Sequence, residues 1–161
     1  MKTERTFLGL VVDSPVGKLT LLATEKGLSG IYFEERCQDP WTPGTNEFLA
    51  QTQRELEQYF AGRRTVFEVP IDPRGTDFQC AVWRELVKIP FGVVVSYLDI
   101  AKGIGNAKAV RAVGLANGAN PISIIVPCHR VIGASGKLVG YGGGLERKRS
   151  LLIHEKAEFL C

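Results

Sequence analysis

The sequence YLDIAKGIGNAKAVRAVGLANG, residues 97–118, is the part of the chain that says most about its fold. Ser96 precedes it and is suited to cap a short helix, Gly105 interrupts the pattern, and Asn106 is suited to cap a second helix over 107–118. Two short helices joined by a tight turn that contains glycine are typical of a helix-turn-helix. Because many helical pairs share this outline, it favours nucleic-acid binding without establishing it.

The second helix of this pair is unusual in having small side chains and one long cation, Arg111, beside Lys108. Its small residues are Ala107, Ala109, Ala112, Gly114 and Ala116. Such a helix can pack closely against a neighbouring helix. It can also press into the groove of a nucleic acid while an arginine reaches inward. The pattern alone leaves both interpretations open.

The pattern of apolar residues changes from strand-like to helix-like near the segment DPRG, residues 72–75. Before it, alternating apolar residues predict short strands over 5–12, 18–24, 28–34 and 65–71, with a proline-rich loop over 37–46 and a helix over 46–62. After it, Thr76 and Gln79 have the spacing of a capping box at the start of a helix that ends before residues 89–92. We therefore expect an α+β protein with a β-rich lobe over 1–72 and a mainly helical lobe over 73–161.

The composition is that of an ordinary globular protein of 161 residues, with 45% hydrophobic and 23% charged residues. A net charge of +3 permits binding to a polyanion but does not require it. Apolar runs are far shorter than the ~20 residues of a membrane helix, and the first residues do not resemble a signal peptide, so we expect a cytoplasmic protein without a membrane partner.

The cysteines and histidines do not form a recognisable metal or disulfide pattern. They are Cys37, Cys80, Cys128, Cys161, His129 and His154. No Cys-x-x-Cys pair occurs among them, so we expect no metal site, and a reducing compartment leaves a thiol free to act as a nucleophile.

Cys128 is the best candidate for that nucleophile. A β-branched run over 122–126 predicts a strand that ends at Pro127, which would place Cys128 in a turn instead of in the core. His129 and Arg130 follow directly, and cations beside a thiol lower its pKa. The ordinary alternative is that Cys128 is a small core residue.

Glu155 is the best candidate for a group that orients His129. It shares the apolar face of a C-terminal helix with Leu151, Leu152 and Phe159. A buried carboxylate is costly unless it is paired. Its partner is either a nearby cation, at positions 147–149, or His129. In the second case Cys128, His129 and Glu155 form a nucleophile, a base and an orienting group, as in a hydrolytic triad or in a protein whose thiol accepts an alkyl group.

The sequence PCHRVIG (127–133), preceded by GLANGANPI (114–122) and followed by GYGGGLERKRSLL (140–152), resembles the active-site region of the O6-alkylguanine-DNA alkyltransferases, also called methylated-DNA–protein-cysteine methyltransferases. The similarity runs from residue 74 to Glu155, about half of the chain. It implies an RNase H-like N-terminal lobe and a monomer that binds double-stranded DNA containing O6-alkylguanine through the minor groove. It also implies a suicidal methyltransferase that repairs the base without a cofactor, with one alkyl transfer to its own cysteine.

The resemblance implies a role for each matching residue. Cys128 accepts the alkyl group, His129 acts as base through a water molecule, and Glu155 orients His129. Tyr97 helps rotate the phosphate and protonates the leaving guanine, and Asn120 stabilises the turn before the cysteine.

The resemblance also implies how DNA is bound. The nucleotide is flipped out of the duplex, and Arg111 fills the gap that it leaves. The other residues expected at the DNA are Ser96, Ala109, Ala112 and Gly114. The residues expected to line the base pocket are Val131, Tyr141, Gly142, Gly143 and Lys148. Two positions depart from common relatives, because Ala107 replaces a proline and Gly142 replaces a serine.

Two other functions remain compatible with these residues. One is a cysteine hydrolase with a Cys-His-Glu triad, and the other is a DNA-binding regulator in which Cys128 senses alkylation. Whether O4-alkylthymine is also a substrate is left open by the sequence.

Overall fold

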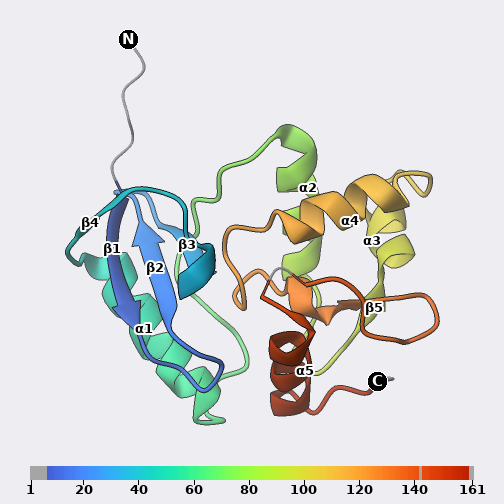
Figure 1. The fold of residues 1–161 in the computed structure, drawn as a ribbon. Helices are drawn as coiled ribbons and strands as arrows, with labels where there is room; N and C mark the ends of the chain where they lie inside the picture. The colour runs from blue at the N-terminus through green and yellow to red at the C-terminus, as the bar shows by residue number, and fades with distance from the viewer. Residues whose placement is uncertain (1–6, 142, 160–161) are drawn as a thin grey trace. The chain divides into compact units, whose positions relative to one another are not determined.

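The computed structural model describes residues 7–141 and 143–159 (Figure 1). The chain divides into two compact units, with the boundary between Pro73 and Arg74. The N-terminal unit contains a sheet and one long helix, and the C-terminal unit is mainly helical.

The N-terminal sheet contains β1 (Phe7–Val12), β2 (Leu19–Ala23), β3 (Leu28–Phe33) and β4 (Trp41–Pro43), in the order β3-β2-β1-β4. The first three strands pair antiparallel, as their alternating apolar residues predict, and β4 pairs parallel with β1. We expected only a loop over 37–46, so β4 is a correction. The indole ring of Trp41 lies over Gly9, where a Cβ would be 2.7 Å from the ring. The ring fits because Gly9 has no side chain.

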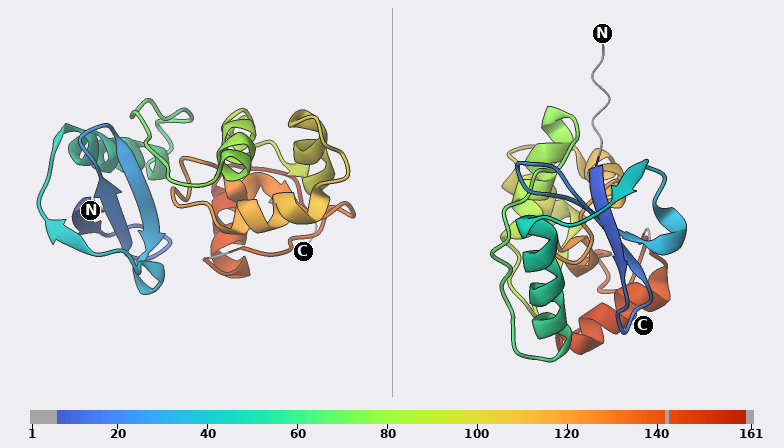
Figure 2. Two further views of the ribbon diagram at one scale, coloured as in Figure 1. Left: turned by 90° about the horizontal axis from the view of Figure 1, so that it is seen from above. Right: turned by 90° about the vertical axis from the view of Figure 1, so that its left-hand side faces the viewer.

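A helix packs along this sheet. After a 3-10 turn, η1 (Glu34–Arg36), and β4, helix α1 (Glu47–Phe60) begins at Asn46, whose side chain accepts a hydrogen bond from the Leu49 amide. Figure 2 shows α1 lying along one side of the strands. Leu49, Leu56 and Tyr59 form its buried apolar face, which matches the predicted amphipathic pattern.

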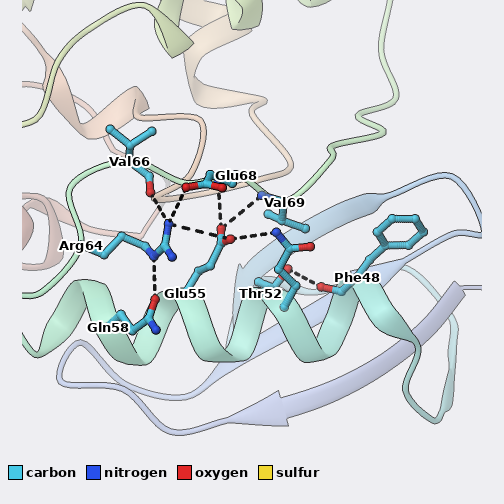
Figure 3. A network of polar contacts seen from close by, with 9 residues as sticks. Phe48, Thr52, Glu55, Gln58, Arg64, Val66, Glu68 and Val69 are labelled. Atoms are coloured by element: carbon cyan, nitrogen blue, oxygen red, sulfur yellow. Dashed lines mark hydrogen bonds and ion pairs between the residues drawn. The ribbon is translucent and has the colours of Figure 1, made fainter.

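Residues 65–71, predicted as a strand, form an irregular segment with a single bridge, between Ile71 and Leu28. Its amides bind a buried carboxylate instead of a neighbouring strand. Glu55 of α1 is 2% exposed and accepts hydrogen bonds from the amides of Glu68 (2.9 Å) and Val69 (3.2 Å). Arg64 lies 3.9 Å from the same carboxylate and donates to the carbonyl of Val66, as Figure 3 shows. The prediction of a strand is therefore wrong, because the amides of this segment bind a side chain.

The C-terminal unit is built on α2 (Asp77–Val87), α3 (Tyr97–Gly103) and α4 (Val110–Gly118), which pack on one another. The predicted capping box is present at α2, where Thr76 and Gln79 bind each other's backbone amides. Ser96 caps α3 as expected. Gly105, with a φ of 81°, lies between α3 and the second helix of the predicted pair. Trp83 of α2 donates to the carbonyl of Ala116 (2.9 Å), which fixes α4 on α2.

The second predicted helix begins later than expected. Its N-cap is Ala109, without a side-chain cap, so Asn106 does not cap it and Ala107 lies outside it. The amide of Ala109 instead binds the carbonyl of Asn106 (3.0 Å), which makes 106–109 a separate turn. The Ala109 amide is the group that a capping Asn106 side chain would bind, so the turn takes the place of the cap.

The remaining elements include the turn that contains Cys128. They are β5 (Val95–Ser96), the 3-10 helix η2 (Cys128–Arg130), β6 (Val131–Ile132) and α5 (Leu145–His154), and β5 pairs parallel with β6. Helix α5 ends at His154, so Phe159 lies beyond the helix on which we had placed it. No helix within 7–141 and 143–159 is both long enough and apolar enough to cross a membrane.

Candidate active site

Cys128 begins η2 and is 4% exposed. Its backbone amide binds the carbonyl of Val126 (2.8 Å), and its own carbonyl accepts a hydrogen bond from the capping amide of Val131. The cysteine therefore lies in a tight turn between two buried valines, and its backbone is fixed on both sides.

The run before it, residues 122–126, is a compact turn and not the predicted strand. The reason is the side chain of Asn120, which accepts from the Ile122 amide (2.9 Å) and donates to the carbonyl of Val126 (2.8 Å). These bonds close the segment on itself. Ile124 adopts a φ of 74°, a conformation that costs a β-branched residue about 1–3 kcal/mol.

His129 is fully buried and faces Glu155, which is the C-cap of α5. The ring nitrogen Nε2 of His129 lies 2.9 Å from Oε2 of Glu155. Because a carboxylate only accepts, Nε2 carries the hydrogen and Nδ1 keeps its lone pair. Among the described residues, Nδ1 of His129 has no hydrogen-bond partner. The imidazole is thus oriented with its basic nitrogen unoccupied.

Arg130 is the residue that the sequence interpretation placed wrongly. We expected its charge beside the thiol, but its guanidinium donates to both oxygens of Glu155, through Nε (2.7 Å) and Nη2 (2.9 Å). It also donates to the carbonyl of Ile89 (2.7 Å). The signal that could have found it is Glu155 itself, because a fully buried carboxylate needs more than one donor.

The titration behaviour of the three groups follows from these contacts. Burial raises the pKa of the Cys128 thiol, although Asn120 and the charge of Lys148 lower it in part, so the expected thiolate is not the resting form. Burial also lowers the pKa of His129, although Glu155 raises it in part. The net lowering keeps the imidazole neutral near pH 7. Burial alone would raise the pKa of Glu155, but donation from His129 and Arg130 outweighs it and holds that pKa well below its usual range.

A second cluster holds the segment that follows β6. Lys148 of α5 is fully buried, and its ammonium donates to the carbonyls of Val131 (2.5 Å), Val139 (2.7 Å) and Gly140 (3.2 Å). Burial lowers the pKa of Lys148 to about 8. The hydroxyl of Tyr97 donates to the same Val139 carbonyl (3.3 Å), and burial raises the tyrosine's pKa. Lys148 and Tyr97 therefore both bind the main chain of this segment.

The other residues expected in the base pocket are partly described. Val131 is buried in β6, and Gly143 is half-buried and accepts a hydrogen bond from Arg147 (3.3 Å). The Tyr141 hydroxyl is buried near Cys128 and Ser123, and burial raises its pKa well above the ordinary value. Gly142 lies outside the described residues.

The residues expected at DNA lie on or beside α3 and α4. Arg111 and Ala112 are exposed on α4, Gly114 is half-buried, and Ala109 is the half-buried N-cap. The Ser96 hydroxyl accepts from the Asp99 amide (3.1 Å) as the cap of α3.

Asn117 was missed by the sequence interpretation. It is 4% exposed on α4, and its Nδ2 donates to the carbonyl of Cys128 (3.4 Å), so it connects the helix of the predicted DNA surface with the cysteine's own main chain. A helical asparagine is a weak signal, because position alone does not say which backbone group it reaches. Within the described ranges, no three Cys, His, Asp or Glu side chains are grouped closely enough to hold a metal ion.

Comparison with known proteins agrees with this layout. Residues 77–157 match the family model of the 6-O-methylguanine DNA methyltransferase DNA-binding domain, and residues 8–73 match that of its ribonuclease-like domain. The methylated-DNA–protein-cysteine methyltransferase of Mycobacterium bovis is 53% identical over 91% of this chain and 90% of its own length. The corresponding protein of Methanosarcina acetivorans is 49% identical over 88% and 94%.

Solved structures give the same result. The crystal structure of Mycobacterium tuberculosis OGT in complex with DNA superposes with a TM-score of 0.87 at 53% identity, over 92% of each chain. The fold class expected from the sequence is confirmed, including the ribonuclease-like N-terminal part. From these matches over nearly its whole length, the chain belongs to the 6-O-methylguanine DNA methyltransferase family.

Proposed function

We propose that this protein repairs DNA by direct reversal, taking the alkyl group from O6-alkylguanine in double-stranded DNA onto the sulfur of Cys128. The observation that carries the proposal is the arrangement of Cys128 beside a buried, neutral His129 whose Nε2 is held by Glu155. The names of its relatives, which specify methylated DNA and a protein cysteine, supply the substrate and the acceptor. The protein acts as a monomer in the cytoplasm, where thiols stay reduced.

The chemistry is an in-line displacement at the alkyl carbon. His129 removes the thiol proton through a water molecule at Nδ1, which is the ring nitrogen without a partner among the described residues. The sulfur then forms a bond to the alkyl carbon as the bond from that carbon to O6 breaks. Tyr97, a neutral phenol with a raised pKa, protonates N3 of the leaving guanine. The product is a thioether, which water does not cleave, so each molecule reacts once.

Access to the base requires that it leave the duplex. We place α4 in the minor groove, with the exposed Arg111 filling the position of the flipped nucleotide. Flipping costs a few kcal/mol and costs least for a badly paired base, which favours damaged nucleotides before any contact in the pocket.

The test is a single-turnover assay with the wild-type protein and a labelled duplex that contains one O6-methylguanine. We expect transfer to stop at one methyl group per protein and the peptide with Cys128 to gain the mass of one methylene group. A parallel duplex with O4-methylthymine decides whether that base is a second substrate. Repeated turnover of an ester or amide would favour the cysteine hydrolase instead, and preference for one undamaged DNA sequence would favour the regulator.

Gly114 offers a test of the minor-groove contact. A Cβ at this position meets no atom of the protein within 4 Å, so packing within the protein does not require glycine there. Glycine in a helix is less stable than alanine by about 0.5–1 kcal/mol. We expect Gly114→Ala to raise the melting temperature but to weaken binding of the duplex, because the added methyl group separates α4 from the groove.

The measurement is a pair of values for each variant, the melting temperature and the Kd for the duplex. Gly118→Ala tests how far along the same face of α4 the close approach extends, since its Cβ also meets nothing within 4 Å. Equal or tighter DNA binding by Gly114→Ala would contradict close approach of α4 at this position.

A further inference from the structure

Leu115 is the most exposed large hydrophobic side chain among the described residues, at 74%. It belongs to α4, whose buried residues, Val113, Ala116 and Asn117, lie toward the other helices. Leu115 is two positions from Val113, which places it about 200° around the helix, on the outward side. Folding of the chain therefore gives this leucine no apolar surroundings.

Leu115 lies on the same face of α4 as Arg111. The two residues are four apart, so they are neighbours on one face of the helix, with Cβ atoms about 5–6 Å apart. Arg111 is exposed as well. Gly114 and Gly118, beside Leu115, leave open space, because a Cβ on either would meet no protein atom within 4 Å. Leu115 thus stands above its immediate neighbours on the side of α4 that carries the exposed arginine.

An exposed apolar side chain next to a cation fits one class of partner especially well. The minor groove of DNA offers a negative potential to the cation and the apolar edges of deoxyribose rings and bases to the leucine. Proteins that bind this groove often insert leucine or similar residues between base steps. The family model that covers α4 is a DNA-binding domain, which makes duplex DNA the occupant to which we commit.

We infer that Leu115 is a DNA-contacting residue that packs into the minor groove one helical turn from Arg111 and supplies an apolar, salt-independent part of the affinity for duplex. The inference rests on the proposed function and deepens it, because it names a contact for which the small neighbouring residues leave room. Alanine at 115 would keep the helix and remove most of the apolar contact.

The experiment measures duplex affinity for the full-length protein at several salt concentrations. We expect Leu115→Ala to weaken binding about tenfold, as loss of most of a buried leucine contact predicts. The slope of log K against log salt stays as in the wild type, because no charge is lost, whereas Arg111→Ala reduces the slope by about one. The control Ile153→Ala removes a 56% exposed side chain from α5 and leaves duplex affinity unchanged.

Two further readouts separate this role from others. Leu115→Ala should keep the wild-type melting temperature and the wild-type rate with free O6-methylguanine nucleoside, which has no groove. Affinity within about twofold of wild type, a changed salt slope, a large fall in melting temperature or a change in oligomeric state would each overturn the inference. If the wild-type protein itself neither binds nor demethylates the duplex, the proposed function fails as well, so the two failures are distinguishable.

Discussion

Replacing Cys128 with alanine abolishes alkyl transfer and leaves the affinity for duplex DNA nearly unchanged. Transfer is lost completely because the acceptor atom is gone, and His129 and Glu155 have no nucleophile of their own to activate. The fold tolerates the change, since alanine replaces a small side chain that is 4% exposed and keeps the backbone bonds of η2. Binding persists because the side chains expected at DNA belong to α4 and to the start of α3.

The measurement is the labelled-duplex assay together with a binding curve for the same variant. The matched control is Cys80→Ala, which makes the same chemical change on α2, where the thiol donates to the carbonyl of Gly75 (3.7 Å). The control should retain full transfer. Methyl transfer by Cys128→Ala, or its loss in Cys80→Ala, would place the nucleophile elsewhere.

Glu155→Gln has the second largest expected effect, and it acts on folding and on rate together. The carboxylate accepts from His129 and twice from Arg130, and it is 2% exposed. Removing one partner of such a buried pair costs about 3–5 kcal/mol, because the guanidinium of Arg130 keeps its charge without its counter-ion. The rate should fall about 100-fold, since His129 is no longer held in the tautomer that leaves Nδ1 basic.

The pH dependence of stability gives this variant a distinct signature. The pKa of Glu155 is lower in the folded protein than in the unfolded chain, where it is about 4.3. The carboxylate therefore contributes its stability above pH 4.3 and loses it as the pH falls below that value. We expect the melting temperature of wild type to fall steeply on acidification and that of Glu155→Gln to start lower and fall less.

Glu158→Gln is the control, because it removes the same charge from an exposed position three residues away. Its melting temperature and transfer rate should follow the wild type. Parallel acid profiles for Glu155→Gln and wild type would mean that the buried ion pairs do not stabilise the folded chain.

Sequence reasoning succeeded where structure is decided within a few residues. The capping box of Thr76 and Gln79 and the cap at Ser96 were predicted, because each needs only groups three positions apart. It failed where a β-branched run bonds to a distant side chain or closes on itself. Residues 65–71 bind Glu55, and residues 122–126 bind Asn120, so neither run is a strand.

The candidate site shows the same division. The adjacency of Cys128 and His129 can be read directly, and Glu155 follows from its place among apolar residues. The bond from Arg130 to Ile89 cannot be read, because the carbonyl that accepts it is 41 residues away. The raised pKa of the thiol was also unpredictable, since it follows from burial that only the folded chain produces.

Lys148 shows which substitutions this chain can accept at a position where the sequence alone shows only a positive charge. An ammonium group has three N–H bonds in a tetrahedral arrangement, and here each has one carbonyl, on Val131, Val139 and Gly140. A guanidinium is planar and larger, and cannot match three converging carbonyls in the same space. We therefore expect replacement of Lys148 by arginine, usually a mild exchange, to be severe here, because the position requires the shape of an ammonium group as well as its charge.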